Sequence, residues 1–177
     1  MALGATVYNV DIELADADRH VYETLAIRVA RHPSESEEYL TARLLAYALE
    51  YGEGLAFSPG GLSEPDEPAL TVRDLTGALQ AWIEIGTPDP ARLHRAAKAA
   101  PRVAVYVHKD PTQFLKRLEG ERIHRAAHVE IRAFDPVFVT ALASRLERRT
   151  KLSLTVTAGE LYVDVAGESL HGAVTPH

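Results

Sequence analysis

Two acidic side chains near residue 35 stand where a core helix would normally carry an aliphatic residue. Glu35 and Glu38 lie at the start of a predicted helix, where Glu38 falls in line with the apolar residues of that helix. Acids favour the first turn of a helix for electrostatic reasons. This preference accounts less well for an acid in line with the buried stripe. Both residues are therefore candidate functional residues.

A second group of acids lies on two predicted strands between residues 64 and 86. If these strands pair about a turn near residues 74–77, Glu67 lies opposite Glu84, with Asp66 adjacent. A shift of one residue exchanges Asp66 and Glu67. Opposed carboxylates with Cβ atoms about 5 Å apart repel each other. A bound Mg²⁺ or Mn²⁺ ion, which takes oxygen ligands, would compensate this repulsion. Alternatively, Glu84, which stands between apolar neighbours, forms an ion pair with an Arg or Lys.

Basic residues follow these acids on the next predicted helix. Arg92 and Arg95 are three residues apart, and Lys98 continues the same side. Because this helix begins a few residues beyond Glu84, its first turns lie near the acids. Cations beside a two-acid metal site would stabilise the charge of a scissile phosphate. The alternative is a solvated helix face.

The composition is that of a globular protein with one domain. Of 177 residues, 46% are apolar, and 19 Lys and Arg stand against 25 Asp and Glu, a formal charge of −6. No apolar run approaches the roughly 20 residues that cross a bilayer, and the first residues lack the pattern of a signal peptide. The absence of Cys excludes disulfides and thiolate sites and fits a cytoplasmic location. The acidic total argues against avid non-specific nucleic-acid binding but allows a local basic groove.

Pro and Gly divide the chain into short strands and helices. We predict an N-terminal hairpin about the turn at 16–19, and a helix over 34–51 with Ser34 and Glu37 as a capping box. Further along we predict two or three strands over 54–86, a helix over 90–100, a strand over 103–107, a short helix after Asp110, a strand over 127–134 and a helix over 136–149. A hairpin about residues 158–159 and a polar tail close the chain. The order indicates one α/β (α+β) domain over residues 1–177, with a mixed sheet flanked by helices.

Several short motifs, in their order and spacing, resemble the YaeQ family of bacterial proteins. They are ARHPSE (30–35), RLLAYA (43–48), DEPAL (66–70), WIEIG with the following Pro and Asp (82–89), and Arg92. The D-x-D-R turn at 16–19 also matches, so the resemblance covers most of the chain to about residue 107. YaeQ-like proteins look like a variant of the PD-(D/E)XK nuclease superfamily. The resemblance therefore implies a restriction-endonuclease-like fold with a helix–three-strand–helix–strand core, and this order matches the elements predicted above.

The resemblance also implies roles for the acids. Glu84 matches the Glu of the superfamily motif, and Asp66 or Glu67 matches its Asp. Glu35 or Glu38 would match the additional acid that many members carry on a helix. In the superfamily these residues hold Mg²⁺.

One position departs from the superfamily motif. Gly86 occupies the place of the Lys that orients or activates water. In some members the basic group lies on the neighbouring helix instead. In this sequence that helix carries Arg92, Arg95 and Lys98. Arg stays protonated and would hold phosphate rather than activate water. Lys98 lies about three turns into its helix.

Three functions follow as hypotheses. The first is a phosphodiesterase, dependent on Mg²⁺ or Mn²⁺, that acts on nucleic acid. The second is a catalytically inactive nuclease-fold protein that binds nucleic acid or a protein partner in a regulatory role. The third is a structural domain whose acids pair with Arg28, Arg31 or Arg43.

Overall fold

The chain folds as a mixed sheet with helices on both of its faces. A computed structural model describes residues 4–59 and 66–177, within which the strands form one ten-stranded sheet. The strands are β1 (Thr6–Asp16), β2 (Val21–Arg31), β3 (Leu55–Phe57), β4 (Leu70–Arg73), β5 (Leu79–Ile85), β6 (Arg102–Val107), β7 (Val129–Phe134), β8 (Arg149–Thr157), β9 (Glu160–Val165) and β10 (Glu168–Pro176). The helices are α1 (Glu37–Leu49), α2 (Pro90–Ala99), α3 (Thr112–Leu118) and α4 (Pro136–Ala143), with the short 3-10 turn η2 (Ala126–His128).

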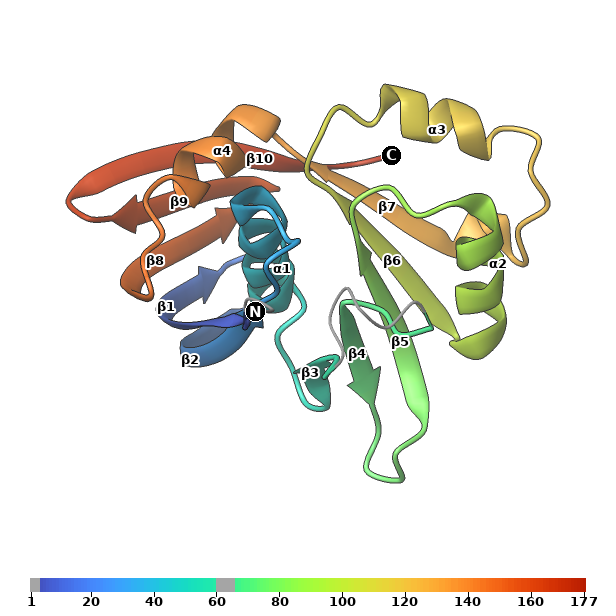
Figure 1. The fold of residues 1–177 in the computed structure, drawn as a ribbon, viewed down its shortest axis with the longest axis horizontal. Helices are drawn as coiled ribbons and strands as arrows, with labels where there is room; N and C mark the ends of the chain where they lie inside the picture. Colours follow the sequence, from blue (N-terminus) through green and yellow to red (C-terminus); the bar gives the residue numbers. More distant parts are fainter. Residues whose placement is uncertain (1–3, 60–65) are drawn as a thin grey trace.

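The sheet curves so strongly that its two halves face each other across α1 (Figure 1). The strand order is β2-β1-β8-β9-β10-β7-β6-β5-β4-β3. One half therefore consists of the two terminal parts of the chain, and the other half consists of β3 to β7. Parallel pairs join β1 to β8, β5 to β6 and β6 to β7, and the other pairs are antiparallel. The result is a barrel-like sheet that is nearly closed.

The C-terminal residues join the two halves of the sheet. The predicted polar tail is wrong: residues 168–176 form β10, which pairs with β9 and also with β7, where Val174 lies opposite Phe134. This strand has a weak apolar pattern because most of its residues are exposed and only Gly172 is buried. Its backbone hydrogen bonds to two partner strands determine its structure.

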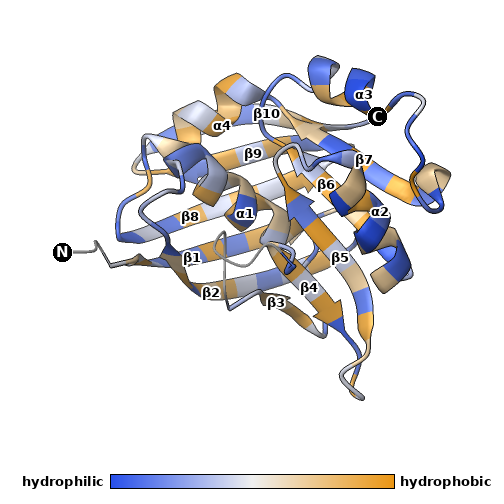
Figure 2. Ribbon diagram, turned by 45° about the vertical axis from the view of Figure 1, so that its right-hand side comes forward, coloured by the Kyte–Doolittle hydropathy of each residue, from blue (hydrophilic) through white to orange (hydrophobic). Residues whose placement is uncertain are grey.

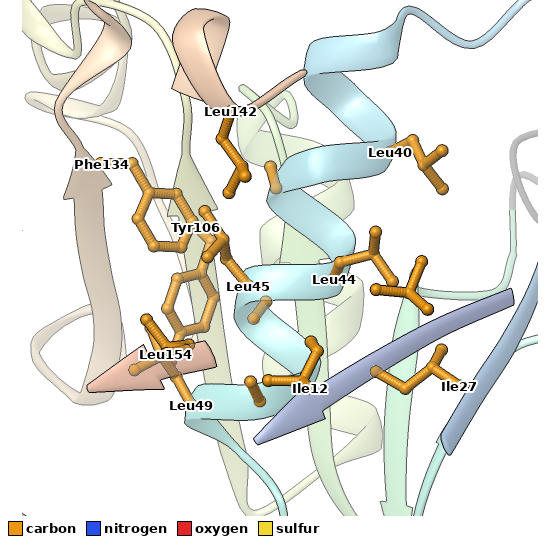
Figure 3. Close-up of a cluster of buried hydrophobic side chains, with 14 of the residues drawn as sticks. Ile12, Ile27, Leu40, Leu44, Leu45, Leu49, Tyr106, Phe134, Leu142 and Leu154 are labelled. Carbon is orange, nitrogen blue, oxygen red and sulfur yellow. The ribbon is translucent and has the colours of Figure 1, made fainter. Parts of the chain in front are cut away.

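Helix α1 fills the space that the curved sheet encloses. Its buried residues lie on nearly all sides rather than on one stripe, as expected for a helix inside a core. Figure 3 shows leucines of α1 packed against β1, β2, β8 and the aromatic rings of β6 and β7, with α4 closing one end. The labelled side chains are Ile12, Ile27, Leu40, Leu44, Leu45, Leu49, Tyr106, Phe134, Leu142 and Leu154.

Helices α2 and α3 cover the outer face of β5, β6 and β7. A second apolar cluster lies between these helices and the strands, with Trp82, Leu93, Val105 and Phe114 among its buried members. Alternation along β5 sends Ile83 towards α1 and Trp82 towards α2. The nearly continuous apolar sequence of β6 follows from this arrangement, because β6 is covered on both faces.

Several predicted boundaries need correction. The first helix spans 37–49 rather than 34–51, because Ser36 caps it by accepting a hydrogen bond from the Tyr39 N–H, while Ser34 Oγ lies 2.6 Å from His32 Nδ1. The helix predicted over 136–149 ends at Ala143, since Arg149 already begins β8. The strand predicted over 127–134 begins at 129, after η2. The predicted starts of α2 and α4 and both predicted hairpins are confirmed.

The pairing predicted for Glu67 and Glu84 is wrong. The β4–β5 ladder begins with Leu70 opposite Ile83, so Glu67 lies before β4 and has no partner in the ladder. The turn between these strands spans 74–78, close to the predicted position.

Candidate functional site

The first candidate site is a polar cluster centred on Glu84 of β5. Glu84 lies on the face of β5 that α2 covers, together with Trp82. Asp89 caps α2 by accepting a hydrogen bond from the Arg92 N–H at 2.7 Å. This cap positions the first turn of α2 beside the strand. Oε1 of Glu84 accepts hydrogen bonds from Nε1 of Trp82 at 2.6 Å and from Nε of Arg92 at 2.7 Å.

The Arg92 side chain links three parts of this cluster. Besides the ion pair with Glu84, its guanidinium lies over the ring of Trp82, 5.8 Å from the ring centre. Its Nη2 donates to the main-chain oxygen of Glu67 at 2.6 Å. Burial raises the pKa of Glu84 above its ordinary value, and the Trp82 hydrogen bond and the Arg92 charge oppose that rise. Arg92 therefore binds a protein carboxylate and a backbone carbonyl.

Glu35 forms a separate, deeply buried ion pair. Its Oε2 lies 2.6 Å from Nη2 of Arg43, and the two side chains are only 1% and 4% exposed. The same Arg43 nitrogen donates to the carbonyl of Ala30 at 2.9 Å. The hypothesis that structural arginines pair with the acids is confirmed for Glu35.

The other predicted metal ligands are not brought into one group. Asp66 is exposed and Glu38 is half-buried. Glu67 is half-buried too, and its Oε2 is a buried atom without a hydrogen-bond partner. Within residues 4–59 and 66–177, no three His, Asp or Glu side chains lie close enough to hold a metal ion. Because Arg92 and Trp82 already donate to Glu84 and Arg43 to Glu35, this donor set does not fit Mg²⁺ or Mn²⁺.

Arg95 and Lys98 lie on the outer side of α2, away from the Glu84 carboxylate. Counted at 100° per residue, both fall opposite the buried Leu93, and both are exposed. They belong to a surface that we call the basic layer, formed by the exposed sides of α2, α3 and the segment 119–128. Its exposed cations are Arg95, Lys98, Lys116, Arg117, Arg122 and Arg125. Figure 2 shows α3 and much of α2 in hydrophilic colours.

A pocket of about 330 Å³ lies where β5 and β6 end. Both strands end at the same edge of the sheet because they are parallel, and α1 begins there too. The lining residues are Ser34, Glu35, Ser36, Tyr39, Ile85, Gly86, Thr87, Val107, His108 and Lys109. In open α/β sheets, ligands bind at the carboxyl ends of strands. The pocket is therefore a second candidate site.

Comparison with known proteins gives the family of this chain. The family model described as "YaeQ protein" matches residues 1–174. The chain belongs to the YaeQ family. The YaeQ protein of Salmonella typhi is 31% identical over 176 residues, covering 99% of this chain and 97% of the relative. That of Escherichia coli K12 is 29% identical over 164 residues, covering 92% and 90%.

Two solved YaeQ structures are similar to this chain over nearly their whole length. The crystal structure from Pseudomonas syringae has a TM-score of 0.87 at 32% identity and covers 97% of this chain and 95% of its own. That from Xanthomonas axonopodis pv. citri has a TM-score of 0.82 at 27% identity and covers 98% of both. The resemblance seen in the sequence to about residue 107 thus extends to the C-terminal part. Within the described part of the chain, no helix is long and apolar enough to cross a membrane.

The sequence reasoning missed two features of this YaeQ-family chain. One is the basic layer as a whole. A count of charges along the sequence finds it, because residues 90–128 contain nine Lys and Arg but only three Asp and Glu. The other is His108, one of eight histidines in the sequence. It is only 8% exposed, and its Nδ1 is a buried atom without a hydrogen-bond partner. No local pattern marks this residue, because its burial results from the packing around the end of β6.

His108 should make the stability of this YaeQ-family chain depend on pH. Burial, and then the charge of Lys109, lower the pKa of His108 below its ordinary value of 6.5. As pH falls through 6.5, the unfolded chain binds a proton that the folded chain does not, so stability falls. A single group gives a slope of at most about 1.4 kcal/mol per pH unit. Urea unfolding between about pH 7.5 and pH 5.5 should show a smaller slope in His108→Gln than in wild type. Equal slopes would contradict the assignment.

Proposed function

We propose that this protein binds nucleic acid through the basic layer and does not act as a metal-dependent nuclease at Glu84. We further propose that its fold is a variant of the PD-(D/E)XK fold. In support, α1, β3, β4, β5, α2 and β6 follow one another in the helix–three-strand–helix–strand order. The three strands are antiparallel, and β6 joins β5 in parallel.

The observation that carries the binding proposal is the local excess of positive charge. The whole chain has a formal charge of −6, yet the segment that contains α2 and α3 is strongly basic. None of the six exposed cations of the basic layer forms an ion pair with an acid in the described residues. Unpaired cations on one surface attract phosphates and release counterions when they bind them. The acidic remainder of the molecule would then direct nucleic acid to this surface.

The arrangement at Glu84 supports binding rather than hydrolysis. A nuclease site needs carboxylates that are free to bind a metal, whereas Glu84 accepts hydrogen bonds from Trp82 and Arg92. Gly86 offers no side chain in place of the motif Lys. Hydrolysis with Mg²⁺ or Mn²⁺ is the alternative function, and it requires saturable binding of the metal at Glu84.

Replacing two cations of the basic layer tests the proposed function. We expect Arg95→Ala/Lys98→Ala to weaken binding to labelled DNA and RNA about tenfold at about 50 mM salt. If both residues contact phosphate on a B-form duplex, the slope of log affinity against log salt should fall by roughly 1.8. Fluorescence anisotropy at about 50 mM and about 200 mM salt measures both quantities.

The matched control is Arg28→Ala/Lys151→Ala. It removes the same charge from exposed positions on β2 and β8, in the other half of the sheet. An equal loss of affinity in this control would indicate an effect of net charge alone. Wild-type protein that binds neither DNA nor RNA at low salt would overturn the proposal and favour the alternative of a protein partner.

A further inference from the structure

We propose that the pocket at the ends of β5 and β6 binds a phosphomonoester. The ligand would be either a free nucleotide or the terminal phosphate of a nucleic-acid strand. The proposal goes beyond binding by the basic layer, because it concerns a different set of residues and a different chemical group. At about 330 Å³ the pocket has the size of small-molecule sites.

His108 supplies the observation that points to a missing partner. Neither of its ring nitrogens has a hydrogen-bond partner in the described residues, although the residue is more than nine-tenths buried and lines the pocket. Burial lowers the pKa of His108, so the imidazole is neutral near pH 7 and has one N–H donor and one acceptor nitrogen. A buried polar group without a partner costs free energy, and a ligand with polar oxygens would remove that cost.

The remaining lining groups are mainly donors. The hydroxyl of Tyr39 keeps its proton, because burial raises its pKa to about 12. Thr87 adds a hydroxyl, and Lys109 adds an exposed cation at the end of β6. A terminal phosphate has three oxygens to accept from such separate donors, whereas a carboxylate has only two.

The start of α1 adds positive potential to the same pocket. Ser36 satisfies two of the first backbone N–H groups: its side chain accepts from Tyr39 and its carbonyl from Leu40. The N–H groups of Glu37 and Glu38 have no partner in the described residues and lie at the end of a 13-residue helix, which favours anions. The carboxylates of these two residues carry the opposite charge, but both residues are outside the pocket lining.

The acid in the lining does not oppose an anion. Glu35 lines the pocket, but its charge is neutralised by the ion pair with Arg43. The charge of Glu38 acts to raise the pKa of His108, but Glu38 does not line the pocket.

The test compares ligands that differ only in one phosphate. AMP and adenosine are titrated by calorimetry, and short strands with a 5′-phosphate or a 5′-hydroxyl are compared by anisotropy. We expect the phosphate to tighten binding at least about tenfold in one or both pairs, the gain expected from charge-assisted hydrogen bonds. Improvement in the AMP pair alone indicates a free nucleotide, and improvement in the strand pair indicates a strand end.

Variants then locate the phosphate. Lys109→Ala, at an exposed position, should remove most of the phosphate-dependent gain while the urea midpoint stays unchanged; His108→Asn should do the same if it folds. Lys151→Ala, an exposed Lys on β8, should keep the gain. The proposal is overturned if the phosphate gives no gain in either pair, or if the gain survives Lys109→Ala. Binding of 5′-hydroxyl strands depends on the basic layer, so failure of the proposed function would be seen separately.

Discussion

Replacing Arg43 by Met is expected to lower the free energy of unfolding by about 4 kcal/mol. Methionine fills a similar space but leaves the Glu35 carboxylate buried without its partner, and the loss of a partner from a buried ion pair is among the most destabilising changes in proteins. Arg43 also lies 5.7 Å from the ring centre of Phe57 and 5.8 Å from that of Tyr39, so its position is fixed by packing. Urea unfolding monitored by circular dichroism measures the loss.

Two further variants serve as controls for Arg43→Met. Arg28→Met makes the same substitution at an exposed position of β2 and should change stability by less than about 0.5 kcal/mol. The double variant Glu35→Gln/Arg43→Met removes both charges and should recover much of the stability lost in the single variant. A loss below about 1 kcal/mol in Arg43→Met would contradict the view that this pair is essential to the core.

The second large effect is expected at Arg92. Arg92→Met should cost about 3 kcal/mol, because Glu84 would keep only the Trp82 hydrogen bond in a buried position. Glu84→Gln, which retains an acceptor for Trp82, should cost less than Arg92→Met. Trp82 is the only tryptophan of the chain, so its fluorescence reports directly on this cluster as urea is added. A smaller loss in Arg92→Met than in Glu84→Gln would contradict the described role of the ion pair.

The same tryptophan allows a test of the metal hypothesis. With Glu84 bound to Arg92 and Trp82, we expect titration of Mn²⁺ to give no saturable heat or quenching that depends on Glu84. Saturable binding in wild type that is lost in Glu84→Ala would restore the metal-dependent phosphodiesterase as the better function. Asp66 and Glu67 would then be the next positions to replace.

The basic layer and the pocket suggest a division of roles within the molecule. Residues 85–87 lead from the pocket into α2, and residues 107–109 lead from it into α3, the two helices of the basic layer. A strand held along the basic layer would have its end close to the pocket. The polar cluster centred on Glu84, which includes Arg92 in the first turn of α2, stabilises the junction between the pocket and the basic layer.

Part of this structure could be predicted from the sequence alone, because it depends on interactions between residues that are close in the chain. The Asp-Pro pairs at 89–90 and 135–136 begin helices, because a side-chain cap and a fixed proline φ act within one turn. The two hairpins were predicted for the same reason, since their strands are neighbours in the chain. The sequence also indicated that Glu84 could form an ion pair with an Arg or Lys, although it did not identify Arg92 as the partner. That partner depends on how α2 packs on β5.

Only the tertiary structure decided how distant segments meet. The sequence contains no sign that β1 would pair with β8, or that the last residues would form a strand joining both halves of the sheet. Such pairings depend on the sum of many burial and hydrogen-bond terms across the whole chain, and a shift of one residue changes every face. For the same reason the sequence left open whether Glu35 binds a metal or pairs with Arg43, and it did not single out His108. The sequence by itself determined most of the elements and the chemical groups that they carry, whereas long-range packing decided the last strand and which of those groups lie together.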